Sequence, residues 1–150
     1  MVRGILLVKS GGDAAVPEWQ AGFQAVAPEF VVRSWTDPSV GPESVAYELV
    51  WEPEPGRIAG YPNLRVIFSS AAGVDHIVRD PTVPPHLPIV RMVSELPAEH
   101  PAWAHERITV TAHLAGYASR KARPASVAAA LAALECSETV PQLYDRARGY

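Results

Sequence analysis

The segment from Ser69 to Asp75 reads Ser-Ser-Ala-Ala-Gly-Val-Asp and follows directly on an apolar run that ends at Phe68. If that run is a parallel strand, the segment lies at the carboxyl edge of the sheet, where open α/β sheets bind ligands. We expect a helix to start over Gly73–Val78, so that the amides of Ala72 and Gly73 are free donors for an anion. A simpler explanation, in which Gly73 only permits a tight turn, fits the spacing equally well.

Three further side chains have types that could do chemistry. His113 follows the alternating run Ile108–Thr111 and could exchange a proton with a substrate. A lone histidine after a strand is nevertheless most often structural. Trp51 ends an apolar run and is either a pocket wall or a packed aromatic side chain. Arg91 ends another run; we include it as a substrate-binding candidate, although a solvent-exposed side chain is the simpler interpretation.

Metal chemistry is not indicated. The chain has one cysteine, Cys136, and the remaining histidines show no metal-ligand spacing with it: His76, His86, His100 and His105. We expect Cys136 to be buried or half-buried near a helix end. Because a single cysteine cannot form an intrachain disulfide, a reducing cytoplasmic location is expected.

Composition limits the partners. The chain has 150 residues, 48% hydrophobic and 19% charged, with a net charge of −3. These are values of one globular domain. No basic run is present, which argues against nucleic acid. The apolar stretches are too short to cross a bilayer, and the N-terminus lacks a signal sequence, so we expect no membrane association.

The elements that must position these residues follow from short apolar runs between prolines and glycines. Five strands are expected, over residues 5–8, 30–32, 47–51, 65–68 and 88–92. Strands that alternate with helices predict an α/β fold, here a flavodoxin-like doubly wound parallel five-stranded sheet in three αβα layers. After Pro124, an apolar stripe predicts a helix that packs on the sheet beside the first helix: Val127, Leu131 and Leu134.

Five segments that span nearly all of the chain carry a more specific inference: Phe68–Ile77, Leu49–Pro53, Glu95–Trp103, Ile108–His113 and Asp145–Tyr150. They resemble the D-isomer-specific 2-hydroxyacid dehydrogenases. In order, they are similar to the family's substrate loop, the tryptophan-bearing loop of its glyoxylate/hydroxypyruvate reductase branch, its acidic-proline segment, the strand before its catalytic histidine, and the reductase tail.

The resemblance implies roles for these residues. Reduction of a 2-oxo acid delivers hydride to carbon and a proton to oxygen. His113 as imidazolium would donate the proton, and Glu95 would orient its ring and raise its pKa. The register of Glu95 is open by one residue, because it runs directly into Leu96. Ala112 also replaces the proline that normally precedes the histidine.

The family's NAD(P)-binding domain and its catalytic arginine are missing. No G-x-G-x-x-G pattern occurs among the ten glycines. We therefore interpret the chain as a single substrate domain, made of 1–93 plus 94–150 joined where that domain would be inserted. The clean edges suggest an engineered deletion. We expect no NAD or NADP binding, no turnover by the isolated chain, and at best weak binding of a small 2-oxo or 2-hydroxy acid or another anion.

Alternatives from other classes stay open. A flavodoxin-like FMN module would need a phosphate loop after the first strand, where Ser10–Asp13 is only a weak version. A phosphoreceiver would need an acidic pair there, and Asp13 is single. A hydrolase using Cys136 and His113 is disfavoured by the predicted position of the cysteine on a helix. We expect a monomer, with a swapped dimer through the Val93–Ser94 junction as the other possibility.

Overall fold

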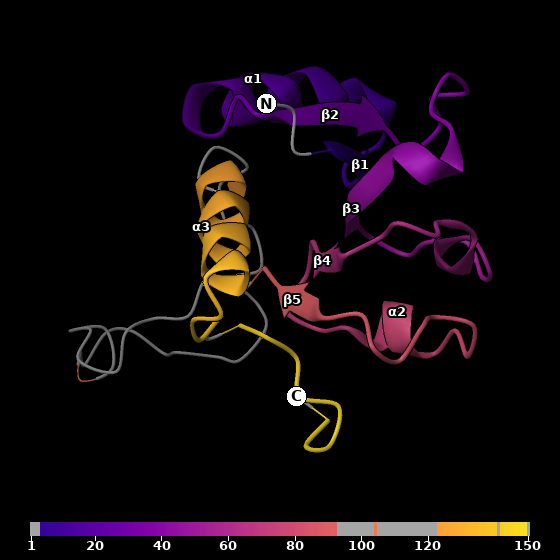
Figure 1. The fold of residues 1–150 in the computed structure, drawn as a ribbon, viewed down its shortest axis with the longest axis vertical. Coiled ribbons are helices and arrows are strands. Elements are labelled where there is room, and N and C mark those ends of the chain that lie inside the picture. The colour runs from indigo at the N-terminus through magenta and orange to yellow at the C-terminus, as the bar shows by residue number, and fades with distance from the viewer. Residues whose placement is uncertain (1–3, 93–103, 105–122, 141, 150) are drawn as a thin grey trace.

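The computed structural model describes residues 4–92, 104, 123–140 and 142–149. Its centre is an all-parallel five-stranded sheet in the order β2-β1-β3-β4-β5 (Figure 1). The strand bounds are β1 Gly4–Lys9, β2 Phe30–Ser34, β3 Val45–Val50, β4 Val66–Ser69 and β5 Ile89–Arg91. This order is the flavodoxin-like one, and the fold predicted from the apolar runs is confirmed.

The strands form where the sequence is continuously apolar because both faces of the sheet are covered. Strand β3 lies at the centre of the sheet, between β1 and β4, and all of its residues are buried. The middle of β1, Leu6–Val8, is buried in the same way. A parallel strand that packs on both sides needs no polar alternation, which is why these runs lack it.

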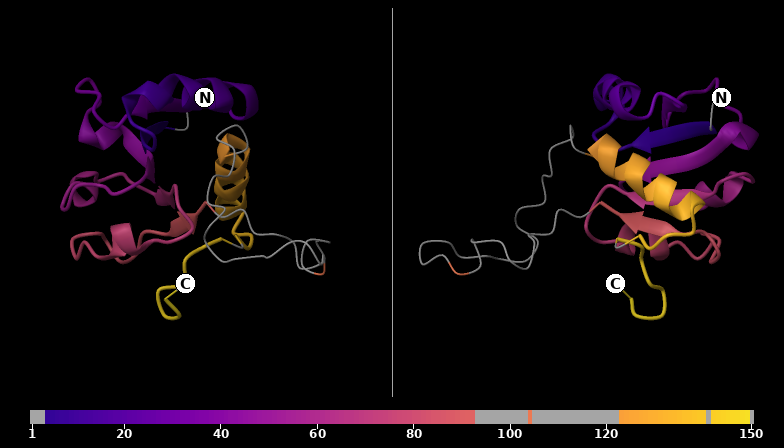
Figure 2. Two further views of the ribbon diagram at one scale, coloured as in Figure 1. Left: turned by 180° about the vertical axis from the view of Figure 1, so that it is seen from behind. Right: turned by 60° about the vertical axis from the view of Figure 1, so that its left-hand side comes forward.

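Two long helices cover one face. Helix α1 spans Val16–Val26, and α3 spans Arg123–Glu135. The two helices contact one another, and Figure 2 shows α3 lying across the sheet beside α1. Both contribute to one apolar cluster with the sheet, through Trp19, Phe23, Val127 and Leu131. The predicted packing of the C-terminal helix beside the first is therefore confirmed, with Leu134 only partly buried.

Shorter elements cover the opposite face. They are the 3-10 turn η3 at Ile58–Gly60 and the single-turn helix α2 at Asp75–Val78. In Figure 1, α2 and α3 lie on opposite sides of the sheet. A second apolar cluster fills this side: Leu7, Trp35, Val45, Val50, Ile58, Leu64, Ile67, Val74, Ile77, Val83, Leu87 and Ile89. Together the two faces give the three predicted layers. Two further 3-10 turns, η1 at Asp13–Ala15 and η2 at Pro42–Ser44, lie in the connections.

The C-terminal residues return to the sheet and protect its edge. Leu143 forms an antiparallel bridge with Val90 of β5. The amide of Arg91 donates to the Gln142 carbonyl at 2.9 Å, and the amide of Tyr144 donates to the Ile89 carbonyl at 2.8 Å. An open strand edge invites pairing with another chain. Here the segment from Gln142 to Tyr144 forms hydrogen bonds with backbone groups on the outer side of β5.

Some expectations need correction. Cys136 follows α3 as an exposed residue, neither buried nor half-buried, because it lies past the last turn of the helix. The strand expected at Ile108–Thr111 lies outside the residues that the structure describes. Among the helices of the described part, none has the length and apolarity that crossing a membrane would require.

Candidate functional site

The carboxyl ends of β3, β4 and β5 bring the predicted loop, tryptophan and arginine to one edge of the sheet. In the strand register, Val50 pairs with Ser69, and Ser69 pairs with Arg91. The amide of Ser70 donates to the Val50 carbonyl at 3.0 Å, and the amide of Met92 donates to the Ser69 carbonyl at 3.0 Å. Trp51, the 69–75 loop and Arg91 therefore leave the sheet side by side, where an open α/β sheet binds ligands.

Ser69 shapes the loop, a role the sequence did not indicate. Its side chain is fully buried. The hydroxyl donates to the Gly73 carbonyl at 2.7 Å and accepts from the Ala71 amide at 3.2 Å. One hydroxyl thus ties both ends of the turn to the last residue of β4. A serine ending a parallel strand, just before small residues and a glycine, is the local signal from which this arrangement could have been inferred.

The amides of Ala72 and Gly73 donate no hydrogen bond to a described residue. They have the free donors that the sequence predicted. The helix expected to start at Gly73 is shorter than predicted, however: α2 begins at Asp75 and has four residues. A single turn adds little dipole. The Asp75 carboxylate also lies close, with one oxygen 3.4 Å from where a Cβ on Gly73 would stand. Binding of an anion at these two amides therefore requires a nearby cation to offset the Asp75 carboxylate.

Arg91 supplies a cation at the same edge. Paired residues on neighbouring parallel strands face the same side, so Arg91 and Ser69 lie on the α2 face of the sheet. The arginine is half-buried, and the interpretation of a solvent-exposed side chain is wrong. Its Nε is buried without a hydrogen-bond partner among the described residues. Because buried donors in native proteins are normally paired, this guanidinium has capacity for an acceptor at the site.

Trp51 lies at the rim of this edge. The predicted strand included it, but β3 ends at Val50 and Trp51 begins the following bend, with 48% of its surface exposed. Its ring packs on His76 of α2, with centroids 4.8 Å apart and planes at 44°. The His76 side chain is buried and its Nε2 lies 3.4 Å from the Ser69 hydroxyl. The sequence gave no role to His76, because its partners come from other strands.

Burial sets the charge state of His76. Desolvation lowers the pKa of the imidazole below its ordinary value. A hydrogen bond with the Val50 carbonyl and the charges of Asp75 and Glu52 act in the opposite direction but do not cancel the effect. The ring is therefore neutral at pH 7. A neutral imidazole packed at a tilt against an indole gives the rim an apolar wall next to the polar loop.

A polar cluster holds the turn that follows Trp51. Glu52 has a φ of 48°, the left-handed region that few non-glycine residues adopt. The Lys9 ammonium donates to the Glu52 carbonyl and, at 2.8 Å, to the Glu54 carboxylate. The Trp35 indole donates to the same carboxylate at 2.7 Å. Burial would raise the pKa of Glu54, but these hydrogen bonds outweigh it and lower the pKa to about 2.

The fit to a nucleotide cofactor is poor in the described part. The turn after β1 contains Gly11 and Gly12, both with positive φ, as phosphate loops do. The next residue is Asp13, whose carboxylate accepts hydrogen bonds from the hydroxyls of Ser34 and Thr36. These bonds lower its pKa, so a negative charge stands where an FMN or dinucleotide phosphate would bind. The described residues at this turn therefore do not fit a phosphate group.

His113 and Glu95, the predicted acid and its orienting carboxylate, lie outside the residues that the structure describes. Their roles stay predictions. Within the described ranges, no group of three or more histidine, cysteine, aspartate or glutamate side chains could hold a metal ion.

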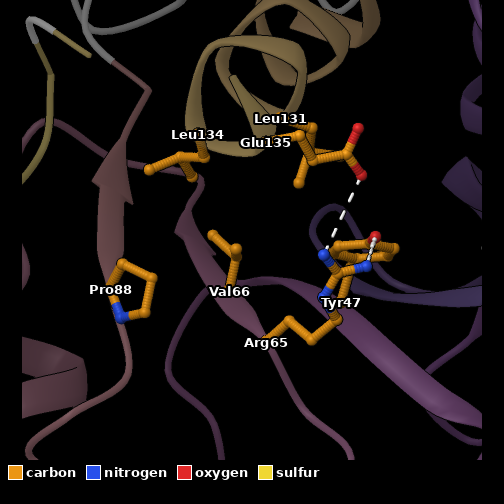
Figure 3. A pocket seen from close by; sticks show the side chains of 7 residues that line it. All are labelled: Tyr47, Arg65, Val66, Pro88, Leu131, Leu134 and Glu135. Carbon is orange, nitrogen blue, oxygen red and sulfur yellow. Dashed lines mark hydrogen bonds and ion pairs between the residues drawn. The ribbon is translucent and has the colours of Figure 1, made fainter. Parts of the chain in front are cut away.

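A separate pocket opens at the other end of the strands, under α3 (Figure 3). Its lining combines apolar residues with an Arg65–Glu135 ion pair at 4.0 Å and an Arg65 hydrogen bond to the Tyr47 hydroxyl at 2.9 Å. Two residues of its wall mark the amino ends of strands: Val66 begins β4, and Pro88 directly precedes β5. The pocket is therefore distinct from the site at the carboxyl edge.

Comparisons with known proteins match about half of the chain. Glyoxylate/hydroxypyruvate reductase A of Yersinia enterocolitica is 34% identical over 80 residues, and that of Serratia proteamaculans is 36% identical over 80 residues. Each match covers 50% of this chain and only 25% of the relative. No family model matches the chain.

A solved structure gives the same result. The D-isomer specific 2-hydroxyacid dehydrogenase of Xanthobacter autotrophicus, in complex with NADPH and MES, aligns with a TM-score of 0.52 and 34% identity, over 59% of this chain and 29% of the other. The resemblance to this family that the sequence predicted is confirmed. The match covers about a quarter of the length of these reductases.

Proposed function

We propose that the chain is the substrate domain of an NAD(P)-dependent 2-hydroxyacid dehydrogenase of the glyoxylate/hydroxypyruvate reductase type, joined near Val93–Ser94 without its nucleotide-binding domain. The observation that carries this proposal is the meeting of the 69–75 loop, Trp51 and Arg91 at one sheet edge. The similarity of the chain to reductases of that name supports it. We further propose that the junction is engineered; the sequence of the source genomic locus tests this directly.

The ligand of this domain is a small 2-oxo or 2-hydroxy acid. Its carboxylate would accept from the Ala72 and Gly73 amides and from the Arg91 guanidinium, a charge-assisted arrangement. Trp51 would cover the apolar side of the ligand. Asp75 opposes the anion, so we expect binding of about millimolar strength, worth roughly 4 kcal/mol. His113 and Glu95 would hold the proton for the carbonyl oxygen.

The isolated chain should not turn the ligand over. Holding donor, acceptor and acid in one geometry contributes on the order of 7–11 kcal/mol to such a reaction. Because the proposed chain lacks the nucleotide-binding domain that would hold the hydride donor, and no G-x-G-x-x-G pattern occurs in its sequence, we expect this contribution to be lost. An assay at 340 nm with NADPH and glyoxylate, repeated on His113→Ala, tests the point. Turnover that disappears in that variant would contradict the proposal.

The binding test uses oxalate, a stable dianion of similar size, and amide shifts in NMR spectra. We expect oxalate to move the Ala72 and Gly73 signals, and Arg91→Gln to weaken its binding by about tenfold. Arg65→Gln is the matched control, because Arg65 lies at the opposite pocket. Equal affinity in all three proteins, or shifts confined to the opposite pocket, would refute the assigned site.

A further inference from the structure

Trp51 needs a partner to hold its side chain. It follows the last residue of β3, so sheet packing does not fix its rotamer, and 48% of its surface is exposed. Its backbone is tied to the sheet, since its amide donates to the Lys9 carbonyl at 2.9 Å. The ring has one aromatic contact among the described residues, the His76 imidazole at 4.8 Å. Whether the indole stands over the loop or swings into solvent depends on that contact.

His76 is itself held firmly. It lies in α2 next to the fully buried Ile77 and is only 8% exposed. It bonds to the Val50 carbonyl, the last of β3, and its Nε2 lies 3.4 Å from the hydroxyl of Ser69, the last residue of β4. The same hydroxyl holds the Gly73 carbonyl. One imidazole therefore links the strand that precedes Trp51 to the loop that carries the free amides.

We infer that His76 is the positioning residue of this site: its imidazole holds Trp51 over the Ser69–Asp75 loop and keeps the apolar wall and the anion-binding amides in one arrangement. The effect on ligand binding rests on the proposed function above. The positioning of Trp51 does not, because it follows from the contacts alone.

Protonation gives this arrangement a measurable signature. The charged groups around the ring are Asp75 beside it, Glu52 on the turn after β3, and Arg79 at the end of α2. Burial holds the pKa of His76 below its ordinary value, so the imidazolium forms at a lower pH than in an exposed histidine. A cation against the indole quenches its emission. Trp51 fluorescence should therefore fall in a single step below pH 6.5, the ordinary value for histidine.

The experiment isolates the Trp51 signal by subtracting the spectrum of Trp51→Phe, and compares His76→Phe, His76→Ala and His86→Ala. His86 is exposed and serves as the control. We expect His76→Phe to abolish the acid step but to keep the shielding of Trp51 from acrylamide. His76→Ala should lose both, with quenching by acrylamide rising about twofold as the paired indole face is uncovered. His86→Ala should behave like the parent.

An acid step that persists in His76→Phe would overturn the inference, as would unchanged acrylamide quenching in folded His76→Ala. If His76→Ala does not fold, by circular dichroism, the His76→Phe comparison decides alone. Oxalate titrations on the same samples separate this inference from the proposed function. Expected Trp51 signals without oxalate binding would refute the function and support the positioning of Trp51. Oxalate binding that is equal in the parent and in His76→Ala would refute the claim that His76 keeps the anion-binding amides in their arrangement.

Discussion

The two faces of the sheet differ in the kinds of side chain that cover them. The face under α1 and α3 is an apolar cluster that includes a chain of edge-to-face rings, Phe23–Phe30 at 6.2 Å and Phe30–Tyr47 at 5.3 Å. The face under α2 and η3 also has an apolar cluster, but Glu48 is buried within the sheet on this side, and the site residues leave the sheet from it. One face supplies packing, and the other combines packing with ionisable side chains.

The buried side chain of Glu48 shows this difference between the faces most clearly. It lies on the central strand between Leu7 and Ile67, both of which belong to the cluster on the α2 side. Its side chain is fully buried, and neither carboxylate oxygen has a hydrogen-bond partner among the described residues. Desolvation raises its pKa to about 8, against the opposing charge of Arg57. A protonated carboxyl is therefore the stable form at neutral pH.

Truncation on the apolar face should have the largest effect on stability. Leu131 is 2% exposed within the cluster of α1 and α3. We expect Leu131→Ala to reduce the free energy of unfolding by about 2–5 kcal/mol, because the cavity cannot close between two helices and a sheet. Urea denaturation measures it, with Leu134→Ala as the control at a partly buried position. Equal losses at the two positions would show that α3 does not bury one defined side.

Glu48 should give the next largest effect, and it depends on pH. The folded state keeps a proton that the unfolded chain loses near pH 4.5, so stability falls as pH rises from 4.5 towards 8. The slope for one proton is about 1.4 kcal/mol per pH unit. Glu48→Gln, which imitates the protonated carboxyl, should remove this slope and be more stable than the parent at pH 8 by a few kcal/mol.

The control is Glu138→Gln, which removes the same charge from an exposed position after α3. It should leave the pH slope of the parent unchanged. Urea denaturation at pH 5, 6.5 and 8 compares the three proteins. If the stability of Glu48→Gln fell with rising pH as steeply as that of the parent, another group would have to bind the proton.

Sequence patterns anticipated the elements better than their ends. The strands followed from apolar runs such as Ile5–Val8, because burial on both faces requires them. The end of β3 did not follow, since Leu49, Val50 and Trp51 are all apolar and only the positive φ of Glu52 turns the chain away. The bridge of Leu143 to β5 was not predicted either, because it depends on a partner far away in the sequence.

The candidate site was predicted in part for the same reason. The loop at Ser69–Asp75 and Arg91 were recognisable, because each follows a strand and parallel strands end at one edge. Glu48 inside an apolar run was not singled out, since its burial without a hydrogen-bond partner depends on neighbours in other strands. His76 acquires its role only through contacts with Trp51 and Ser69, which come from two other elements.

Close packing of α1 against α3 on the apolar face should give a smaller effect on stability. Gly22 lies in α1 where a Cβ would be 2.6 Å from Cγ of Pro124 in α3. Alanine should favour the helix by about 1 kcal/mol, but overpacking costs about 1–3 kcal/mol, so we expect a net loss near 1 kcal/mol. Gly60→Ala in η3, where nothing lies within 4 Å, is the matched control on the other face and should be neutral.

The combination with Pro124→Ala decides the cause. If the close approach of α1 and α3 produces the loss, the double variant should recover it, since the opposing atom is gone. Additive losses in thermal or urea denaturation would instead indicate that Gly22 is required for reasons within its own helix.

The smallest effect concerns the polar cluster beside the site. Glu54 has a pKa of about 2, below its unfolded value of 4.5, so its contribution is present above pH 4.5 and is lost as pH falls towards 2. Its side chain is 54% exposed, however, and solvent screens the Lys9 contact. We therefore expect Glu54→Gln, which keeps an acceptor for the Trp35 indole, to cost less than about 1 kcal/mol at pH 7. The difference from the parent should shrink as pH falls from 4.5 towards 2 and vanish below pH 2, because protonation then removes the charge in the folded state as well. A loss that stays constant down to pH 2, measured by urea denaturation, would show that the carboxylate acts through its shape and not through its charge. The α2 side would then resemble the apolar face more closely than its charged groups suggest.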